Sequence, residues 1–186
     1  VKVADNQSAL EGGGIHVRNV ANTTIEESLF EGNEAGQNSF GGGLYAHQSA
    51  YVKIRNSTFR SNTAHYGGGA YINDNAEGSD FYNNIFLDND ARTGGGFALC
   101  NSPYTLFYNN TVVGNRTLYE TPGAAFYNSQ VEFRNNIFVG NVVTSRVNRD
   151  KVNWRGGSPR GVEMPDLIRT GDPWFRPVDL QFGPDG

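Results

Sequence analysis

The stretch Phe133-Arg134-Asn135-Asn136-Ile137-Phe138-Val139-Gly140-Asn141 decides the fold, because its pattern recurs along the chain. Each copy reads apolar, any, polar, Asn or Ser, any, apolar, any, any, Asn. Earlier copies occupy residues 107–115, 81–89, 54–62 and 25–33, and a truncated copy opens the chain at residues 3–6. The closing residues are Asn6, Asn33, Asn62, Asn89, Asn115 and Asn141, at intervals of 26 to 29 residues. This regularity indicates a repeat protein in which each unit buries its apolar face against its neighbours.

Glycine triplets recur with the same period, at residues 12–14, 41–43, 67–69 and 94–96, and Pro122-Gly123-Ala124-Ala125 stands in for a fifth. Glycine is suited to corners that need positive φ or a close approach of the backbone. Asn also tolerates the left-handed conformation, and stacked Asn side chains can hydrogen-bond along a ladder. We therefore interpret both signatures as structural, with no ligand required.

Composition narrows the class of protein. The length of 186 residues is typical of one domain. The net charge of −4 does not indicate the basic surface that nucleic-acid binding requires. Cys100 is alone, which excludes an internal disulfide framework and a cysteine zinc site. No apolar run approaches the roughly 18 residues of a membrane span, and no signal peptide is recognisable. Because Val1 begins in mid-repeat, we expect a processed protein or a piece of a longer one.

The repeat unit predicts one turn of a coil of short parallel strands. Residues 15–18 and 52–55 alternate apolar and polar, as strands with one buried face do. About 27 residues are too few for a strand, a crossover helix and a second strand. Stacked coils should place equivalent side chains above one another in columns, with successive members of a column about 4.8 Å apart. The predicted inner columns are Ile25, Ile54, Phe81, Phe107 and Phe133; Phe30, Phe59, Phe86, Val112 and Phe138; Ile15, Leu44, Ala70, Phe97 and Ala125; and Val17, Ala46, Ile72 and Leu99.

The paired signatures resemble those of right-handed parallel β-helix proteins of the pectin-lyase-like superfamily. The signatures resemble in particular those of polymorphic outer-membrane protein repeats and of related bacterial cell-surface β-helix domains. The resemblance covers residues 3–141 and implies an all-β solenoid of about five coils. It specifies a fold better than a function, because lyases, glycosidases, adhesins and phage tail proteins share the scaffold.

Residues 142–186 lack the repeat and form a second predicted unit after the β-helix of residues 1–141. Solenoid ends expose strand edges and an open core, so a capping segment is expected. The alternative is one wall of a binding groove. The apolar residues available for either role are Trp154, Met164, Leu167, Ile168, Trp174, Phe175, Leu180 and Phe182.

The strand after each glycine triplet should present two outward columns. One contains His16, Tyr45, Tyr71, Ala98 and Phe126, and the next contains Arg18, His47, Asn73, Cys100 and Asn128. Rings, cations and amides are what a groove for an acidic polysaccharide needs, so the predicted binding residues are His16, Tyr45, Tyr71, Arg18, His47 and Asn73. The alternative is ordinary cross-strand packing on an exposed sheet face.

No catalytic motif is present in the sequence. If the protein is an enzyme, lyase or glycosidase chemistry would need a base and a proton donor. His47 and Tyr45 are the best-placed types, with Arg18 as a further candidate.

Acidic turns offer a possible Ca²⁺ site through oxygen ligands, although solvated turn carboxylates are commoner. The candidates are Asp74, Glu77, Asp80, Asp88 and Asp90. No cofactor is otherwise expected.

Together these features predict a secreted or cell-surface bacterial module with a structural, adhesive or glycan-binding role, and a polysaccharide lyase or hydrolase as the alternative. No nucleic-acid partner and no membrane span are expected. The half-repeat at residues 3–6 also predicts either further coils before Val1 or end-to-end self-association.

Overall fold

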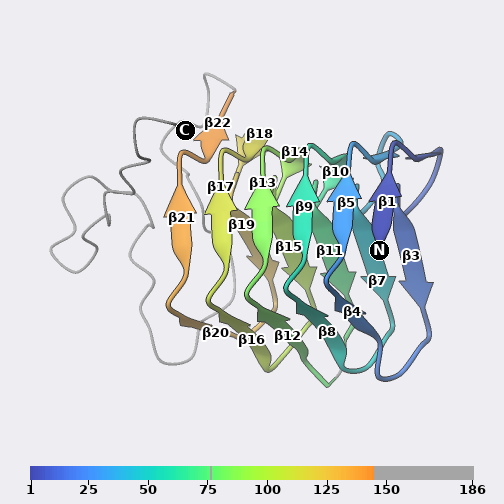
Figure 1. The fold of residues 1–186 in the computed structure, drawn as a ribbon, viewed down its shortest axis with the longest axis vertical. Helices are drawn as coiled ribbons and strands as arrows, with labels where there is room; N and C mark the ends of the chain where they lie inside the picture. The colour runs from blue at the N-terminus through green and yellow to red at the C-terminus, as the bar shows by residue number, and fades with distance from the viewer. Residues whose placement is uncertain (76, 145–186) are drawn as a thin grey trace, which may run out of the picture.

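The computed structural model describes residues 1–75 and 77–144, and these fold into an all-β parallel solenoid of about five coils (Figure 1). Each coil contributes one strand to each of four sheets, here named A to D. Sheet A consists of β1 (Lys2–Ala4), β5 (Leu29–Glu31), β9 (Thr58–Arg60), β13 (Ile85–Leu87), β17 (Thr111–Val113) and β21 (Ile137–Val139). Sheet B consists of β2 (Gln7–Ser8), β6 (Glu34–Ala35), β10 (Thr63–Tyr66), β14 (Asp90–Thr93), β18 (Arg116–Glu120) and β22 (Val142–Val143).

Sheets C and D follow the glycine triplets. Sheet C consists of β3 (Ile15–Arg18), β7 (Leu44–His47), β11 (Ala70–Asn73), β15 (Phe97–Cys100) and β19 (Ala124–Tyr127). Sheet D consists of β4 (Thr24–Glu26), β8 (Val52–Arg55), β12 (Ser79–Tyr82), β16 (Thr105–Tyr108) and β20 (Val131–Arg134). In Figure 1, sheet A faces the viewer, sheet C lies behind it, and sheets B and D run along the upper and lower borders.

The core is a set of stacked columns between the sheets. Strand register confirms the predicted columns that begin at Ile25 and at Phe30, which follow sheets D and A. Rings stack directly in these columns, with centroids 4.5 Å apart for Phe30 and Phe59 and 5.0 Å apart for Phe59 and Phe86. Burial of successive aromatic side chains at strand spacing therefore supplies the hydrophobic stabilisation.

A ladder of buried asparagine amides runs along the corner between sheets A and B. The Asn62 Nδ2 donates to Asn89 Oδ1 at 3.0 Å and to the Phe30 carbonyl oxygen at 3.0 Å, while its backbone N donates to the same Asn89 Oδ1. The pattern repeats along the predicted column: Asn6, Asn33, Asn62, Asn89, Asn115 and Asn141. A second ladder, through Ser57, Asn84, Asn110 and Asn136, follows the corner between sheets D and A.

The left-handed conformation lies one residue earlier than predicted. The ladder asparagines have ordinary φ, and the residue before each one has positive φ: Asp5, Gly32, Ser61, Asp88, Gly114 and Gly140. The ladder amide needs a fixed position to pair with backbone groups, and the preceding residue takes the sharp turn. The two roles predicted for one residue are thus divided between neighbours.

Within each glycine triplet the positions have different constraints. The first, such as Gly41, has positive φ (65°). The second, such as Gly68, approaches backbone so closely that an added Cβ would lie 2.5 Å from the Asp90 carbonyl oxygen. Both structural roles that we predicted for these glycines are confirmed.

The fifth unit differs from its predicted register by one residue. The bulge between β14 and β18 places Thr121, with φ of 54°, at the first position of the triplet. Ala124 consequently pairs with Phe97, so Ala125 faces outward and Phe126 points into the core. Tyr127, and not Asn128, lies beside Cys100. The outward placement predicted for Phe126 was wrong because a one-residue slip exchanges the two faces of a strand.

The predicted second unit falls mostly outside the described residues. Val142 and Val143 form β22 and pair with β18, so the solenoid continues beyond residue 141. The capping role proposed for the segment from residue 145 to residue 186 stays a prediction. At the opposite end, β1, β2, β3 and β4 are the terminal strands of their sheets within the described residues.

Substitution of Phe126 by Ala should destabilise the fold by about 3–5 kcal/mol, since the side chain is fully buried. Urea unfolding followed by circular dichroism measures the loss. Phe86→Ala should cost a similar amount, and Ile85→Ala, with Ile85 43% exposed, should cost much less. A small loss for Phe126→Ala would contradict the observed register.

Substitution of Asn89 by Ala should also be severe. It removes the acceptor of the Asn62 backbone N–H and of one Asn62 Nδ2 bond, and it removes the amide donor to the Phe59 carbonyl. Asn115 Oδ1 loses the same amide donor but keeps its bond from the backbone N of residue 89. At about 1–3 kcal/mol for each unsatisfied buried group, the loss should exceed about 3 kcal/mol in urea unfolding. Asn83→Gly is the control, because Asn83 is exposed and glycine keeps its positive φ. Equal stability of the two variants would refute the structural role of the ladder.

Candidate functional site

The predicted binding residues lie together on the outer face of sheet C. Strand register places His16, Tyr45 and Tyr71 in one column across β3, β7 and β11. Arg18, His47 and Asn73 form the neighbouring column on the same strands. The predicted proximity of these six residues is therefore confirmed. Whether they can bind a ligand depends on which of their side chains are exposed to solvent.

Tyr45 and Tyr71 are buried, not exposed as the sequence predicted. Phe40 and Tyr66, which lie before β7 and at the end of β10, pack over them. The Phe40 ring is 5.5 Å from Tyr45 and 4.9 Å from Tyr71, and the two tyrosines are 2% and 6% exposed. These rings form an outer hydrophobic cluster, so their faces cannot stack on a ligand.

Three histidines border this cluster: His65 stacks on Tyr66, and His16 and His47 each lie beside a carboxylate. His47 Nε2 lies 3.4 Å from Asp74 Oδ2, and His16 Nε2 lies 3.9 Å from Glu11 Oε2. Partial burial lowers the pKa of His16 despite the opposing charge of Glu11. His16 is therefore mainly neutral at pH 7, when it can accept or donate a hydrogen bond but gives little attraction to an anion.

The burial of the tyrosines gives little support to the hypothesis of catalysis at the outer face of sheet C. Burial raises the pKa of Tyr45 to about 12 despite the neighbouring Asn73 side chain. Burial also raises the pKa of Tyr71, which contacts the Cys100 thiol. A proton donor must reach the substrate, and the hydroxyl of a tyrosine that is only 2% exposed does not.

The tyrosine burial predicts a loss of stability in alkali. Tyr45 ionises near pH 10 when unfolded and about two units higher when folded, so the folded state holds more protons between these values. The contribution of Tyr45 to the free energy of unfolding should be fully present below about pH 10 and should be lost as the pH rises towards about 12. Tyr45→Phe should lessen this fall when urea unfolding at about pH 9 is compared with urea unfolding at about pH 11.5. Identical pH profiles for wild type and Tyr45→Phe would refute the assignment.

The metal candidates do not form a metal-binding group. Among residues 1–75 and 77–144, no three His, Cys, Asp or Glu side chains are arranged to hold an ion. Asp74 accepts a hydrogen bond from Asn101 Nδ2 at 2.8 Å, Glu77 contacts the Tyr51 hydroxyl, and Asp80 lies on the outer face of sheet D. A Ca²⁺ site at these residues stays a prediction without a geometric basis.

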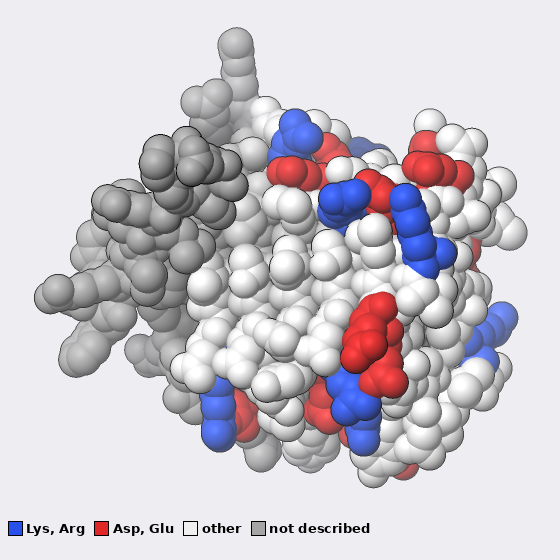
Figure 2. All heavy atoms as spheres, viewed as in Figure 1, with Lys and Arg blue, Asp and Glu red and all other residues white. Residues whose placement is uncertain are grey.

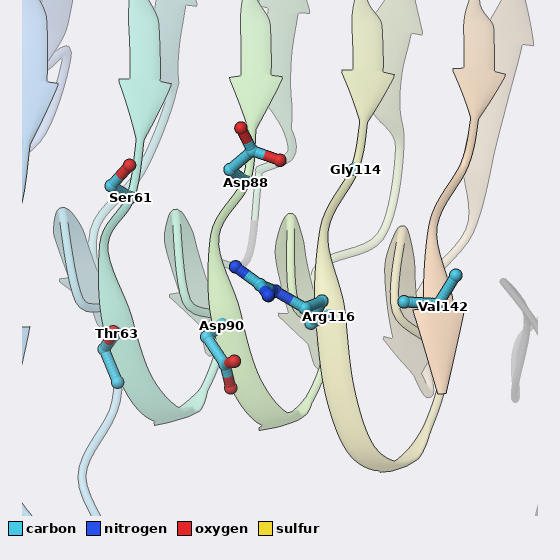
Figure 3. A pocket seen from close by; sticks show the side chains of 7 residues that line it. All are labelled: Ser61, Thr63, Asp88, Asp90, Gly114, Arg116 and Val142. Atoms are coloured by element: carbon cyan, nitrogen blue, oxygen red, sulfur yellow. The ribbon is translucent and has the colours of Figure 1, made fainter. Parts of the chain in front are cut away.

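Asp88 and Asp90 line a groove at the corner between sheets A and B (Figure 3). It encloses about 540 Å³, and Arg116 extends into it towards the two carboxylates. Desolvation raises the pKa of Asp90, and the Arg116 charge opposes the shift. A guanidinium in the groove disfavours a metal cation there. The remaining lining residues are Ser61, Thr63, Gly114 and Val142.

The outer face of sheet A offers few groups for chemistry. Over β13, β17 and β21 it carries no Lys, Arg, Asp or Glu, and charged side chains gather along its borders (Figure 2). The outward residues of these strands are Ile85, Leu87, Thr111, Val113, Ile137 and Val139. Such a surface can pack against apolar groups but cannot orient a polar ligand.

Sheet D carries exposed tyrosine rings of the kind that the sequence interpretation assigned to the strands after the glycine triplets. Tyr82 and Tyr108 are neighbours on β12 and β16, with ring centroids 5.0 Å apart. Tyr82 is 39% exposed and Tyr108 is half-buried. Beside them a groove of about 240 Å³ is lined by Leu106, Tyr108, Glu132 and Arg134.

Local sequence explains this placement. Phe81 and Phe107 occupy the inner column of sheet D, so the residue after each must point outward. The following residue, Asn83 or Asn109, turns the corner with φ of 56°. The repeated Phe-Tyr-Asn-Asn motif at residues 81–84 and 107–110 therefore indicates exposed tyrosines from sequence alone.

A line of exposed asparagines accompanies the tyrosines. Asn56, Asn83, Asn109 and Asn135 take the corner positions of successive coils. The Asn83 Nδ2 donates to Asn56 Oδ1 at 2.8 Å. Carboxamides carry both donors and acceptors, so this line can bond hydroxyl groups of a ligand lying on the rings.

With the fold and surfaces described, comparison with known families identifies the class of protein. Residues 1–153 match the family described as right handed beta helix region, and the chain belongs to that family. Comparisons with curated proteins and with solved structures find no match. The described part of the chain contains no helix with the length and apolar character needed to span a membrane.

Proposed function

We propose that this β-helix is a non-catalytic glycan-binding module. Its site is the tyrosine groove of sheet D, which consists of Tyr82 and the adjacent groove lined by Leu106, Tyr108, Glu132 and Arg134. The observation that carries the proposal is the exposed Tyr82–Tyr108 pair beside a groove on an otherwise rigid scaffold. Aromatic faces pack against the C–H faces of sugar rings, and nearby polar groups fix their orientation.

Rigidity favours binding at this site. The core residues Phe81 and Phe107, directly before the two tyrosines, are fully buried and hold the strands in register. Tyrosine has only two side-chain torsions, so the two rings lose little conformational entropy when a ligand binds. The groove therefore needs no rearrangement of the backbone.

The alternative function is a polysaccharide lyase or hydrolase at sheet C. His47 and Asp74 would be its base and orienting carboxylate. Tyr45 cannot easily donate a proton there because Phe40 and Tyr71 pack against it. We therefore prefer binding without turnover.

We further propose that the module works at a cell surface or outside the cell, where long polysaccharides are available. An adhesive role follows if the bound glycan belongs to another surface. Longer β-helical arrays, formed by added coils or by a second copy at the β1–β4 end, would extend such a surface.

Glycan binding predicts retarded migration in native gels that contain a soluble polysaccharide. A panel of hydroxyethylcellulose, xylan, glucomannan, polygalacturonate and alginate provides the test. Tyr82→Ala and Tyr108→Ala should each weaken binding by about tenfold or more, a change of only about 1.4 kcal/mol. Lost ring contact is the physical reason.

Tyr119→Ala is the matched control, because Tyr119 is a similarly exposed tyrosine on sheet B. It should bind as the wild type does. Migration unaffected by every polysaccharide, in protein whose urea unfolding is cooperative, would overturn the proposed function.

The enzyme alternative has its own measurement. Incubation with polygalacturonate and alginate should release no unsaturated sugar ends detectable by ultraviolet absorbance, and no new reducing ends. Turnover that disappears in His47→Ala but persists in Tyr82→Ala would instead establish catalysis at sheet C.

A further inference from the structure

Charge on sheet D defines the class of glycan that the tyrosine groove accepts; this inference rests on the proposed function. The outward side chains of β4, β8, β12, β16 and β20 include three acids and three bases. They are Glu26, Asp80 and Glu132, and Lys53, Arg55 and Arg134. The face as a whole therefore carries no net charge.

Both arginines beside the tyrosines already have carboxylate partners. Arg55 Nε donates to Glu26 Oε2 at 2.7 Å, and Arg134 forms an ion pair with Glu132. An acidic sugar would have to compete with these carboxylates for the guanidinium groups. It would also approach Glu132, which lines the groove itself. The local field consequently gives an anionic ligand no advantage.

The uncharged groups of the site run along the solenoid axis. Tyr82 and Tyr108 occupy equivalent positions on successive strands, about 4.8 Å apart, and the exposed asparagines follow the same direction. A chain lying along this direction meets the two rings, with the corner asparagines Asn83 and Asn109 directly after them in sequence. Hydroxyl groups satisfy those amides without any charge.

We infer that the groove binds a neutral, hydroxyl-rich polysaccharide lying parallel to the solenoid axis, and not the acidic polysaccharide expected from the sequence. Sheet D selects it by pairing each arginine internally and leaving rings and amides for the ligand. The Glu132–Arg134 pair is then a specificity element, because it removes the positive charge that would attract carboxylates.

Hydroxyethylcellulose and carboxymethylcellulose test this inference, because they share a backbone and differ in substituent charge. The full chain should bind the neutral polymer at least about tenfold more tightly in affinity electrophoresis. Its affinity should change less than about twofold between low salt and about 0.5 M NaCl, since little charge is involved. Tighter binding of carboxymethylcellulose that vanishes in salt would overturn the inference while leaving glycan binding intact.

Glu132→Gln provides the sharper comparison, because it leaves Arg134 without its carboxylate partner at unchanged side-chain volume. This variant should gain affinity for carboxymethylcellulose relative to hydroxyethylcellulose by severalfold at low salt. Glu34→Gln, on sheet B, is the control and should alter neither affinity. Unchanged selectivity in Glu132→Gln would show that the ion pair does not determine specificity. Failure of both polymers and of the wider panel would instead overturn the proposed function.

Discussion

Buried amide hydrogen bonding at the corners is the interaction on which this structure depends. A chain that turns every few residues cannot pair all its peptide groups within sheets, and unpaired buried groups are costly. The side-chain amide of Asn62 supplies such pairing, because it donates hydrogen bonds to Asn89 Oδ1 in the next coil and to the Phe30 carbonyl oxygen in the preceding coil. The same arrangement in every coil makes the corners as regular as the sheets.

Regular corners fix the register of everything between them. Once each coil closes at the same point, Phe30, Phe59 and Phe86 must stack, and the outward positions must also align. The inner columns supply hydrophobic stabilisation. The outer columns remain free to differ between sheets, so binding properties can be built without changing the scaffold.

What covers an outer column decides whether it can bind a ligand. On sheet C, Phe40 and Tyr66 pack over the aromatic column and convert it into a second small core. On sheet D, the Tyr82 ring remains exposed and a groove lies beside Tyr108. Similar residue types thus have different roles because only one of the two faces is covered by a neighbouring segment.

The sequence by itself determined the repeat length, the parallel solenoid and the inner columns, because these follow from short-range periodicity that every coil repeats. It also determined the alignment of His16, Tyr45 and Tyr71 on sheet C. Tertiary structure decided the face of Phe126, because the single extra residue in the β18 bulge sets the register and has no distinctive residue type. It likewise decided that Tyr45 and Tyr71 are buried while Tyr82 is accessible. Coverage depends on where a segment such as the one carrying Phe40 packs in space, and alternation along one strand contains no information about that neighbour.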